Sequence, residues 1–254
     1  MDISILIMGL LIGWLVGVTG VGGAALLTPI LILIGISPTI AVGTDLVYNS
    51  ITKLFGSIQH WRQKNINYQL VIYLAIGSVP SAIIAVTSLH FFEFSNGLQE
   101  QIIKHSLGYV LVIVACITLI NTFLNPEKQN NSLKNKSISE KRELTIIIGG
   151  ILGFIVGLTS IGSGSLFAIA MMFLYRLRTS ELVGTDIAHA FILVSIVGTL
   201  NASMGNVDYW MVGNLLLGSV PGVLMGSNIA IKIPDKPLRV LVSFIILISG
   251  IKLI

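Results

Sequence analysis

Three polar side chains share one face of an otherwise apolar segment early in the chain. Asp45, Asn49 and Lys53 are spaced i, i+4 and i+8, which places them on the same side of a helix. Lys53 lies nine residues before Arg62, roughly 13 Å along a helix, and is therefore well inside a membrane if Arg62 marks the surface. A buried lysine is a group that holds a small anion. The alternative is that Lys53 pairs structurally with an aspartate or extends to the membrane surface.

A related pattern returns 141 residues later with a different set of polar groups. Thr185 and Asp186 match Thr44 and Asp45, so we expect a duplicated but asymmetric site. The positions of Tyr48, Asn49 and Lys53 are taken by His189, Ala190 and Val194. Because carboxylates inside a membrane are costly and usually functional, we predict a role in coupling or gating for Thr44, Asp45, Thr185, Asp186 and His189. The alternative for the two aspartates is a cap-like contact with the hairpin turns described next.

Two glycine-rich turns, at 17–23 and 157–165, interrupt apolar segments. The flanking arms have about 12–18 residues, or roughly 18–27 Å of helix, which is short for a membrane span of about 30 Å. A helix that begins inside the membrane directs unpaired N–H groups at its surroundings, and these groups bind anions. The residues predicted to bind substrate are Thr19, Gly20, Gly22, Gly23, Asn49, Lys53, Thr159, Ser160, Gly162 and Ser163. The alternative for each single glycine is close helix packing.

The elements that position these residues are membrane-spanning helices. Of the 254 residues, 54% are hydrophobic and 10% are charged, against about a quarter charged in soluble domains. Five stretches lack Asp, Glu, Lys and Arg: 3–44, 65–92, 105–126, 144–175 and 209–231. Each is long enough for one or two spans, so we predict an all-α integral membrane protein with about eight to ten segments. Cys116 is the only cysteine, which excludes an internal disulfide and dithiol redox chemistry. We expect no cofactor, metal or nucleic-acid partner.

An internal duplication organises these helices. Residues 43–80 and 184–221 are identical at twelve of 38 positions, including Gly-Ser-Val-Pro at 77–80 and 218–221. Upstream, at an offset of 140, Gly13, Gly17, Thr19 and Gly22 match Gly153, Gly157, Thr159 and Gly162. We predict a first repeat at 1–123, a polar linker at 124–143 and a second repeat at 144–254. The expected helices lie near 3–18, 24–35, 39–60, 66–90, 102–123, 144–159, 164–176, 180–201, 207–231 and 236–254.

Charge placement predicts that the second repeat is inverted relative to the first. Because each repeat has five segments, an odd number, the second repeat enters the membrane from the side opposite to the first. The loop at 62–64 is basic while its counterpart at 203–208 is not, and the loop before the eighth segment carries Arg176 and Arg178. Basic loops face the cytoplasm. We therefore predict a multi-pass protein of the bacterial cytoplasmic membrane, with the linker inside and both termini outside.

The run Gly-x-x-x-Gly-x-Thr-Gly-x-Gly-Gly from Gly13 to Gly23, followed by Pro29, and the repeated Gly-Thr-Asp resemble the sulfite exporter TauE/SafE family, also called DUF81 or TSUP. The resemblance covers nearly the whole chain. It implies a permease for small anions, often sulfur-containing ones such as sulfite or sulfonates. The second repeat departs from the pattern, with Ser160 and Ser163 in place of Gly20 and Gly23 and with no proline matching Pro29.

Inverted repeats with interrupted helices are typical of carriers that expose a central site to each side in turn. The sequence therefore predicts a transporter of a small, sulfite-like anion embedded in the lipid bilayer, with proton exchange through Asp or His residues and assembly into a homo-oligomer both left open. A passive anion channel is the alternative. An intramembrane enzyme, with Asp45 and Asp186 as a dyad or Ser163 with His189 as a protease pair, is less well supported, because the duplication alone explains the two aspartates. We predict that the protein is not an enzyme.

Overall fold

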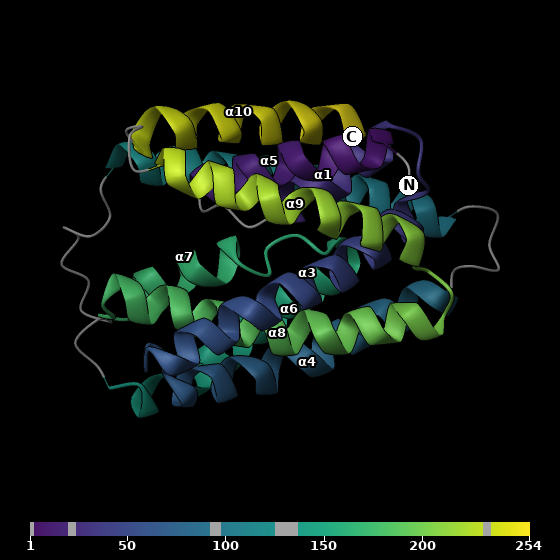
Figure 1. Ribbon diagram of the computed structural model, residues 1–254. Coiled ribbons are helices and arrows are strands. Elements are labelled where there is room, and N and C mark those ends of the chain that lie inside the picture. The colour runs from purple at the N-terminus through teal and green to yellow at the C-terminus, as the bar shows by residue number, and fades with distance from the viewer. Residues whose placement is uncertain (1–2, 20–23, 92–97, 125–136, 231–234) are drawn as a thin grey trace.

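A computed structural model describes residues 3–19, 24–91, 98–124, 137–230 and 235–254, and these segments form ten α-helices with no strand (Figure 1). The first five are α1 (Ile3–Thr19), α2 (Ala24–Leu33), α3 (Pro38–Arg62), α4 (Tyr68–Phe91) and α5 (Leu98–Leu124). A 3-10 turn, η3 (Ser139–Lys141), precedes α6 (Arg142–Thr159), α7 (Ser165–Leu174), α8 (Thr179–Ser203), α9 (Tyr209–Ala230) and α10 (Asp235–Leu253). The predicted all-α class is confirmed, and the helix bounds agree with the predicted segments within a few residues.

Local residue chemistry explains where several helices begin and end. Pro38 stands in the first turn of α3, where a missing N–H costs nothing. Helix α6 ends because Ser160 adopts a left-handed backbone with φ of 62°, and Gly162 follows with φ of 96°. The chain then reverses within 160–164 and starts the ten-residue helix α7. In Figure 1 this turn lies away from both ends of the bundle, as predicted for an interrupted hairpin.

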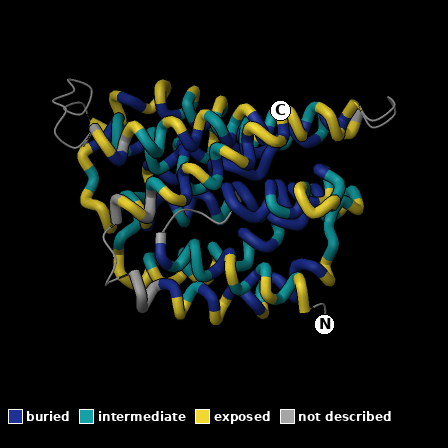
Figure 2. The backbone as a smooth tube through the Cα atoms, turned by 90° about the horizontal axis from the view of Figure 1, so that it is seen from above, coloured by how far each residue is buried: buried dark blue, intermediate teal, exposed yellow. Residues whose placement is uncertain are grey.

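The helices have the length and surface of a membrane bundle. Five described helical segments are long and apolar enough to span a bilayer: Tyr68–His90, Leu98–Ile120, Ser139–Thr159, Thr179–Ser203 and Tyr209–Gly226. Large apolar side chains such as Ile72, Ile151 and Leu224 are exposed along their outer faces, whereas the buried residues gather in the interior (Figure 2). The twenty-five-residue helix α3 is not among the five, because it carries the polar residues of the candidate site.

The closest helix contacts join the two halves of the chain. Helix α1 packs along α9, and α6 packs along α4, while α3 lies against α8 and α5 against α10. Glycines make the first two contacts possible. A Cβ on Gly13 would lie 2.7 Å from Cα of Ser219, and Gly153 meets the backbone of Ser78 in the same way. Since Ser78 and Ser219 are matched positions of the duplication, each contact is the counterpart of the other.

The matched threonines also bind across the two halves. The hydroxyl of Thr44 accepts a hydrogen bond from the backbone N–H of Asp208 at 3.1 Å, and that of Thr185 accepts one from Asn67 at 3.0 Å. Both threonines are fully buried. The turn before α9 is thus attached to α3, and the turn before α4 to α8. These two turns lie at opposite ends of the bundle in Figure 1.

Candidate functional site

A cluster of polar side chains lies where α3 and α8 meet the turn 160–164. Helix α3 supplies three of its members from one face, as the i, i+4, i+8 spacing predicts: Asp45, Asn49 and Lys53. Helix α8 supplies Asp186 and His189. The cluster is enclosed by apolar helices, so each polar atom in it needs a partner from the protein or a ligand.

The carboxylate of Asp45 accepts hydrogen bonds from three side chains. Its Oδ1 accepts from Nδ2 of Asn49 at 2.7 Å, and its Oδ2 accepts from the hydroxyl of Thr28 at 2.9 Å and from that of Ser160. The side chain is fully buried. Asp45 therefore connects α3 with the interrupted hairpin of the other half and with α2. The sequence left a contact of Asp45 with the hairpin turn open as an alternative, and in the structure each oxygen of this carboxylate has at least one donor.

Lys53 reaches the beginning of α7. Its Nζ donates to the backbone carbonyl of Ser163 at 3.1 Å, and a Cβ placed on Gly164 would lie 3.1 Å from that Nζ. Gly164 is the N-terminal cap of α7 and provides no side-chain cap for the first N–H groups of the helix. An ammonium group and a helix N-terminus therefore lie side by side in an apolar surrounding, which favours the binding of an anion.

Asp186 and His189 face the same region from α8. The position of a Cβ on Gly164 is 3.6 Å from Oδ2 of Asp186, so this carboxylate borders the α7 N-terminus together with Lys53. Within the described residues, Oδ1 of Asp186 and Nδ1 of His189 are buried and have no hydrogen-bond partner. Nε2 of His189 lies 2.8 Å from the hydroxyl of Ser78, and its ring packs on Phe167 with centroids 4.4 Å apart.

Several predicted site residues lie elsewhere or outside the described segments. Thr44 and Thr185 hold the turns at the two ends of the bundle, and Thr159 bonds to the backbone of its own helix at Ile155. Gly162 is buried beside Leu166. Gly20, Gly22 and Gly23 lie outside the described residues, as does the side chain of Thr19.

Sequence reasoning missed four members of the cluster: Thr28, Ser78, Gly164 and Phe167. Ser78 belongs to the duplicated Gly-Ser-Val-Pro, so its recurrence as a polar residue in an apolar run was a usable signal. Thr28 gave the weaker signal of a single hydroxyl inside the apolar segment that became α2. Gly164 lies within the predicted glycine-rich turn 157–165 but was not among the predicted binding residues, and nothing in the sequence distinguished Phe167 from an ordinary packing residue.

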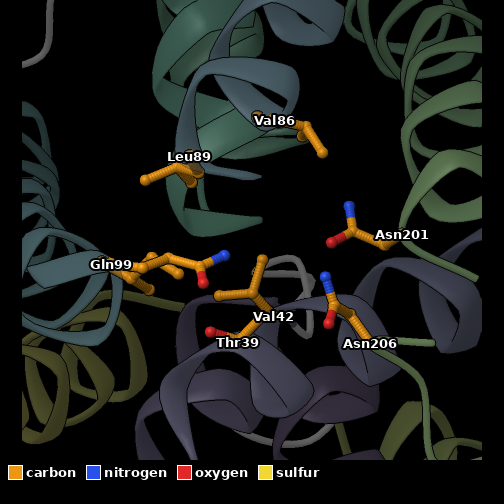
Figure 3. Close-up of a pocket in the computed structure, with 9 residues that line it drawn as sticks. Thr39, Val42, Val86, Leu89, Gln99, Asn201 and Asn206 are labelled. Atoms are coloured by element: carbon orange, nitrogen blue, oxygen red, sulfur yellow. The ribbon is translucent and has the colours of Figure 1, made fainter. Parts of the chain in front are cut away.

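A small pocket lies next to this cluster, closer to the end of the bundle where α4 ends and α8 ends. Its lining includes the side-chain amides of Gln99, Asn201 and Asn206 (Figure 3). Val42 and Gly157 also line it, and each precedes a cluster residue, Asp45 or Ser160, by three positions. The pocket is therefore about one helical turn from the cluster.

A buried polar cluster in a bundle of apolar helices is an arrangement found in membrane transporters, and the comparisons identify this class. The chain matches the family described as Sulfite exporter TauE/SafE over residues 5–253, and it belongs to that family. It is 59% identical to the probable membrane transporter protein YjnA of Bacillus subtilis, with both chains covered completely. It is 26% identical to YdhB of the same organism over 98% of this chain and 99% of that one. A probable membrane transporter of Methanocaldococcus jannaschii is 27% identical, covering 97% of this chain and 93% of its own length. No solved structure matches.

Proposed function

We propose that this transporter carries a small sulfur-containing oxyanion or organosulfonate and binds it between Lys53 and the N-terminus of α7. The observation that carries the proposal is the position of the ammonium of Lys53, which lies beside Gly164 at an uncapped helix start inside the bundle. An anion there receives a full positive charge and backbone N–H groups together. The family description supports the sulfur chemistry of the substrate.

The transport cycle that we propose is alternating access between two inverted repeats, 1–123 and 144–254, joined by a cytoplasmic linker at 124–143. The contacts of Thr44 with Asp208 and of Thr185 with Asn67 support it, because they hold one turn at each end of the bundle against the opposite half. Release of one contact at a time opens the site to one side. The basic loops at 62–64 and 176–178 support a location in the cytoplasmic membrane, with these loops on the inner side.

Uptake of labelled anions into proteoliposomes that contain the purified protein tests this function. The expected result is saturable uptake of labelled sulfite or of a sulfonate such as isethionate, with competition by other small oxyanions and none by chloride at equal concentration. Accumulation above the external concentration when a pH gradient is imposed identifies a coupled carrier. Uptake that only equilibrates the anion identifies a passive channel, and failure to move any of these anions contradicts the proposal.

A further inference from the structure

The two matched aspartates have opposite surroundings. The three donors to Asp45 are Thr28, Asn49 and Ser160. When the two repeats are aligned by sequence, the counterparts of these donors carry no donor side chain: Ala190 replaces Asn49, Gly20 replaces Ser160, and Thr28 aligns with either Ala168 or Ile169. None of the three counterparts of the donors to Asp45 can therefore donate a side-chain hydrogen bond to Asp186.

Asp186 remains buried despite this loss. Its side chain is only 6% exposed, and its Oδ1 has no hydrogen-bond partner in the described part of the chain. A buried carboxylate without donors is costly when charged. Such a group is stable when it faces a cation or when it carries a proton.

The cation available to it is Lys53. Both groups border Gly164: a Cβ at that position would lie 3.1 Å from Nζ of Lys53 and 3.6 Å from Oδ2 of Asp186. Lys53 is also the group proposed to hold the transported anion. A bound anion and a charged Asp186 therefore compete for the same ammonium group.

We propose that Asp186 takes up one proton for each anion that binds at Lys53 and releases it when the anion leaves. In the empty site, charged Asp186 neutralises Lys53; in the loaded site, the anion neutralises Lys53 and Asp186 is a neutral acid. A monovalent anion thus leaves the net charge of the site unchanged, and the proton comes from the water on the side from which the anion enters. This inference rests on the proposed anion transport and adds its coupling ion.

The other groups near Asp186 leave it as the best proton carrier. From α3, Lys53 borders Asp186 at Gly164, and Asp45 on the same face of α3 accepts hydrogen bonds from Thr28, Asn49 and Ser160. His189, one turn along α8, is held between Ser78 of α4 and Phe167 of α7. Helix α7 contains no titratable side chain. His189 is the competing candidate, and the experiment separates the two.

The test measures binding of methanesulfonate and sulfate to purified full-length protein by titration at several pH values, because these anions do not titrate in the range where the protein is folded. Above the pH at which Asp186 loses its proton, the affinity of the wild-type protein for these anions is expected to fall roughly tenfold for each pH unit. Asp186→Asn, a mimic of the protonated form, is expected to bind at all pH values within about threefold of the acidic wild-type affinity. In proteoliposomes with an internal pH dye, anion entry is expected to acidify the lumen with wild type but not with this variant.

Asp208→Asn is the matched control. Oδ1 of Asp208 accepts from the backbone of Met211, and Asn67 makes the same contact with Leu70 at the corresponding place in the first half. This variant is therefore expected to keep the wild-type pH dependence. If Asp186→Asn does not fold, Asp186→Glu provides the test. Because glutamate also binds a proton, anion affinity should fall with pH at the wild-type slope, but the midpoint of this fall should lie at a different pH.

Three results overturn the inference while leaving anion transport intact: a wild-type affinity that does not change with pH, a pH dependence that survives Asp186→Asn, or a dependence abolished by His189→Gln instead. An unchanged midpoint in Asp186→Glu also contradicts it. Absence of anion binding by wild type at every pH contradicts the proposed function itself, and the coupling with it.

Discussion

The proposed anion site depends on Lys53. Removing a charge from a buried pair costs about 3–5 kcal/mol when the partner stays charged, but Asp186 is able to take up a proton and become neutral. We therefore expect Lys53→Met to remain folded, because methionine keeps a stem of similar length. Anion affinity should fall at least about tenfold at every pH, which is about 1.4 kcal/mol of binding free energy. Anion-dependent thermal stabilisation measures it.

The control for this variant is Lys104→Met, which removes an exposed lysine at the start of α5 and should bind anions like wild type. If Lys53→Met protein is absent from the membrane instead of inactive, Lys53 has a structural role, and the anion site lies elsewhere.

Gly162 tests the contribution of the interrupted hairpin. Its φ of 96° favours glycine, and a Cβ would lie 2.7 Å from Cδ1 of Leu166 in the turn that precedes α7. Gly162→Val should therefore weaken anion binding at least about tenfold by displacing the start of α7, in addition to a backbone cost of roughly 1–2 kcal/mol. Size-exclusion profiles and anion titration measure the two effects separately.

Gly35 provides a matched control for this backbone cost, because its φ is 97° and nothing lies within 4 Å of an added Cβ. Gly35→Val should lower stability by a similar amount and leave anion affinity unchanged. Equal anion affinity in both variants would exclude the 160–164 turn from the site.

At the scale of elements, α1 and α9 approach closely because glycines line their contact. A methyl group on Gly13 would meet Cα of Ser219 at 2.7 Å, so Gly13→Ala has to separate the two helices. We expect it to destabilise the protein by about 1–3 kcal/mol, as overpacking does. Gly213 on α9 has nothing within 4 Å of an added Cβ, so Gly213→Ala should be neutral or stabilise by up to about 1 kcal/mol. Thermal unfolding in detergent compares them, and equal melting temperatures would disprove the contact.

The cross-half contacts of the threonines make a second prediction at this scale. Thr44→Val keeps the shape of the side chain and leaves the backbone N–H of Asp208 without its acceptor. The loss should cost about 1–3 kcal/mol in the state in which this turn is attached to α3. Because only that state is destabilised, the variant should increase the accessibility of the turn 203–208 to a water-soluble thiol reagent, measured on a cysteine placed at the half-buried Val207. Thr185→Val should leave the accessibility of the turn 203–208 unchanged, because Thr185 contacts the turn at the other end of the bundle.

At the scale of the whole molecule, the bundle carries aromatic residues near both ends. Trp61 and Tyr68 are exposed where α3 ends and α4 begins, and Tyr209 and Trp210 are exposed at the start of α9. Tyrosine and tryptophan are enriched at the two membrane surfaces. Their positions are consistent with α4 and α9 crossing the bilayer.

Orientation in the membrane is a prediction that cysteine labelling checks. In a Cys116→Ser background, single cysteines at Lys64 and Arg178 should react with an impermeant reagent only from the cytoplasm, and one at Ser203 only from outside. These three residues are exposed. We expect these sides because the turns at positions 64 and 178 are basic, and basic loops face the cytoplasm. Reaction of positions 64 and 203 from the same side would remove the inverted repeat.

The sequence by itself determined the helices and the class of protein. Apolar runs free of charge set the number and bounds of the helices, because a bilayer requires about 20 apolar residues and internal hydrogen bonding. Local turn chemistry placed the reversal between Ser160 and Gly164. Helical spacing put Asp45, Asn49 and Lys53 on one face before any neighbour was known, and the duplicated Gly-Thr-Asp indicated the two aspartates.

Only the tertiary structure decided which polar groups meet. Lys53 contacts Ser163, 110 residues away, and Asp45 contacts Ser160, 115 residues away. Periodicity shows that a helix face is polar but not which helix lies opposite, since that depends on the fit of glycine contacts between α1 and α9 and between α4 and α6. The different environments of Asp45 and Asp186 arise at this level, because the donors to Asp45 come from α2, α3 and the turn after α6. The same three-residue motif therefore holds a satisfied carboxylate in one half and an unsatisfied one in the other.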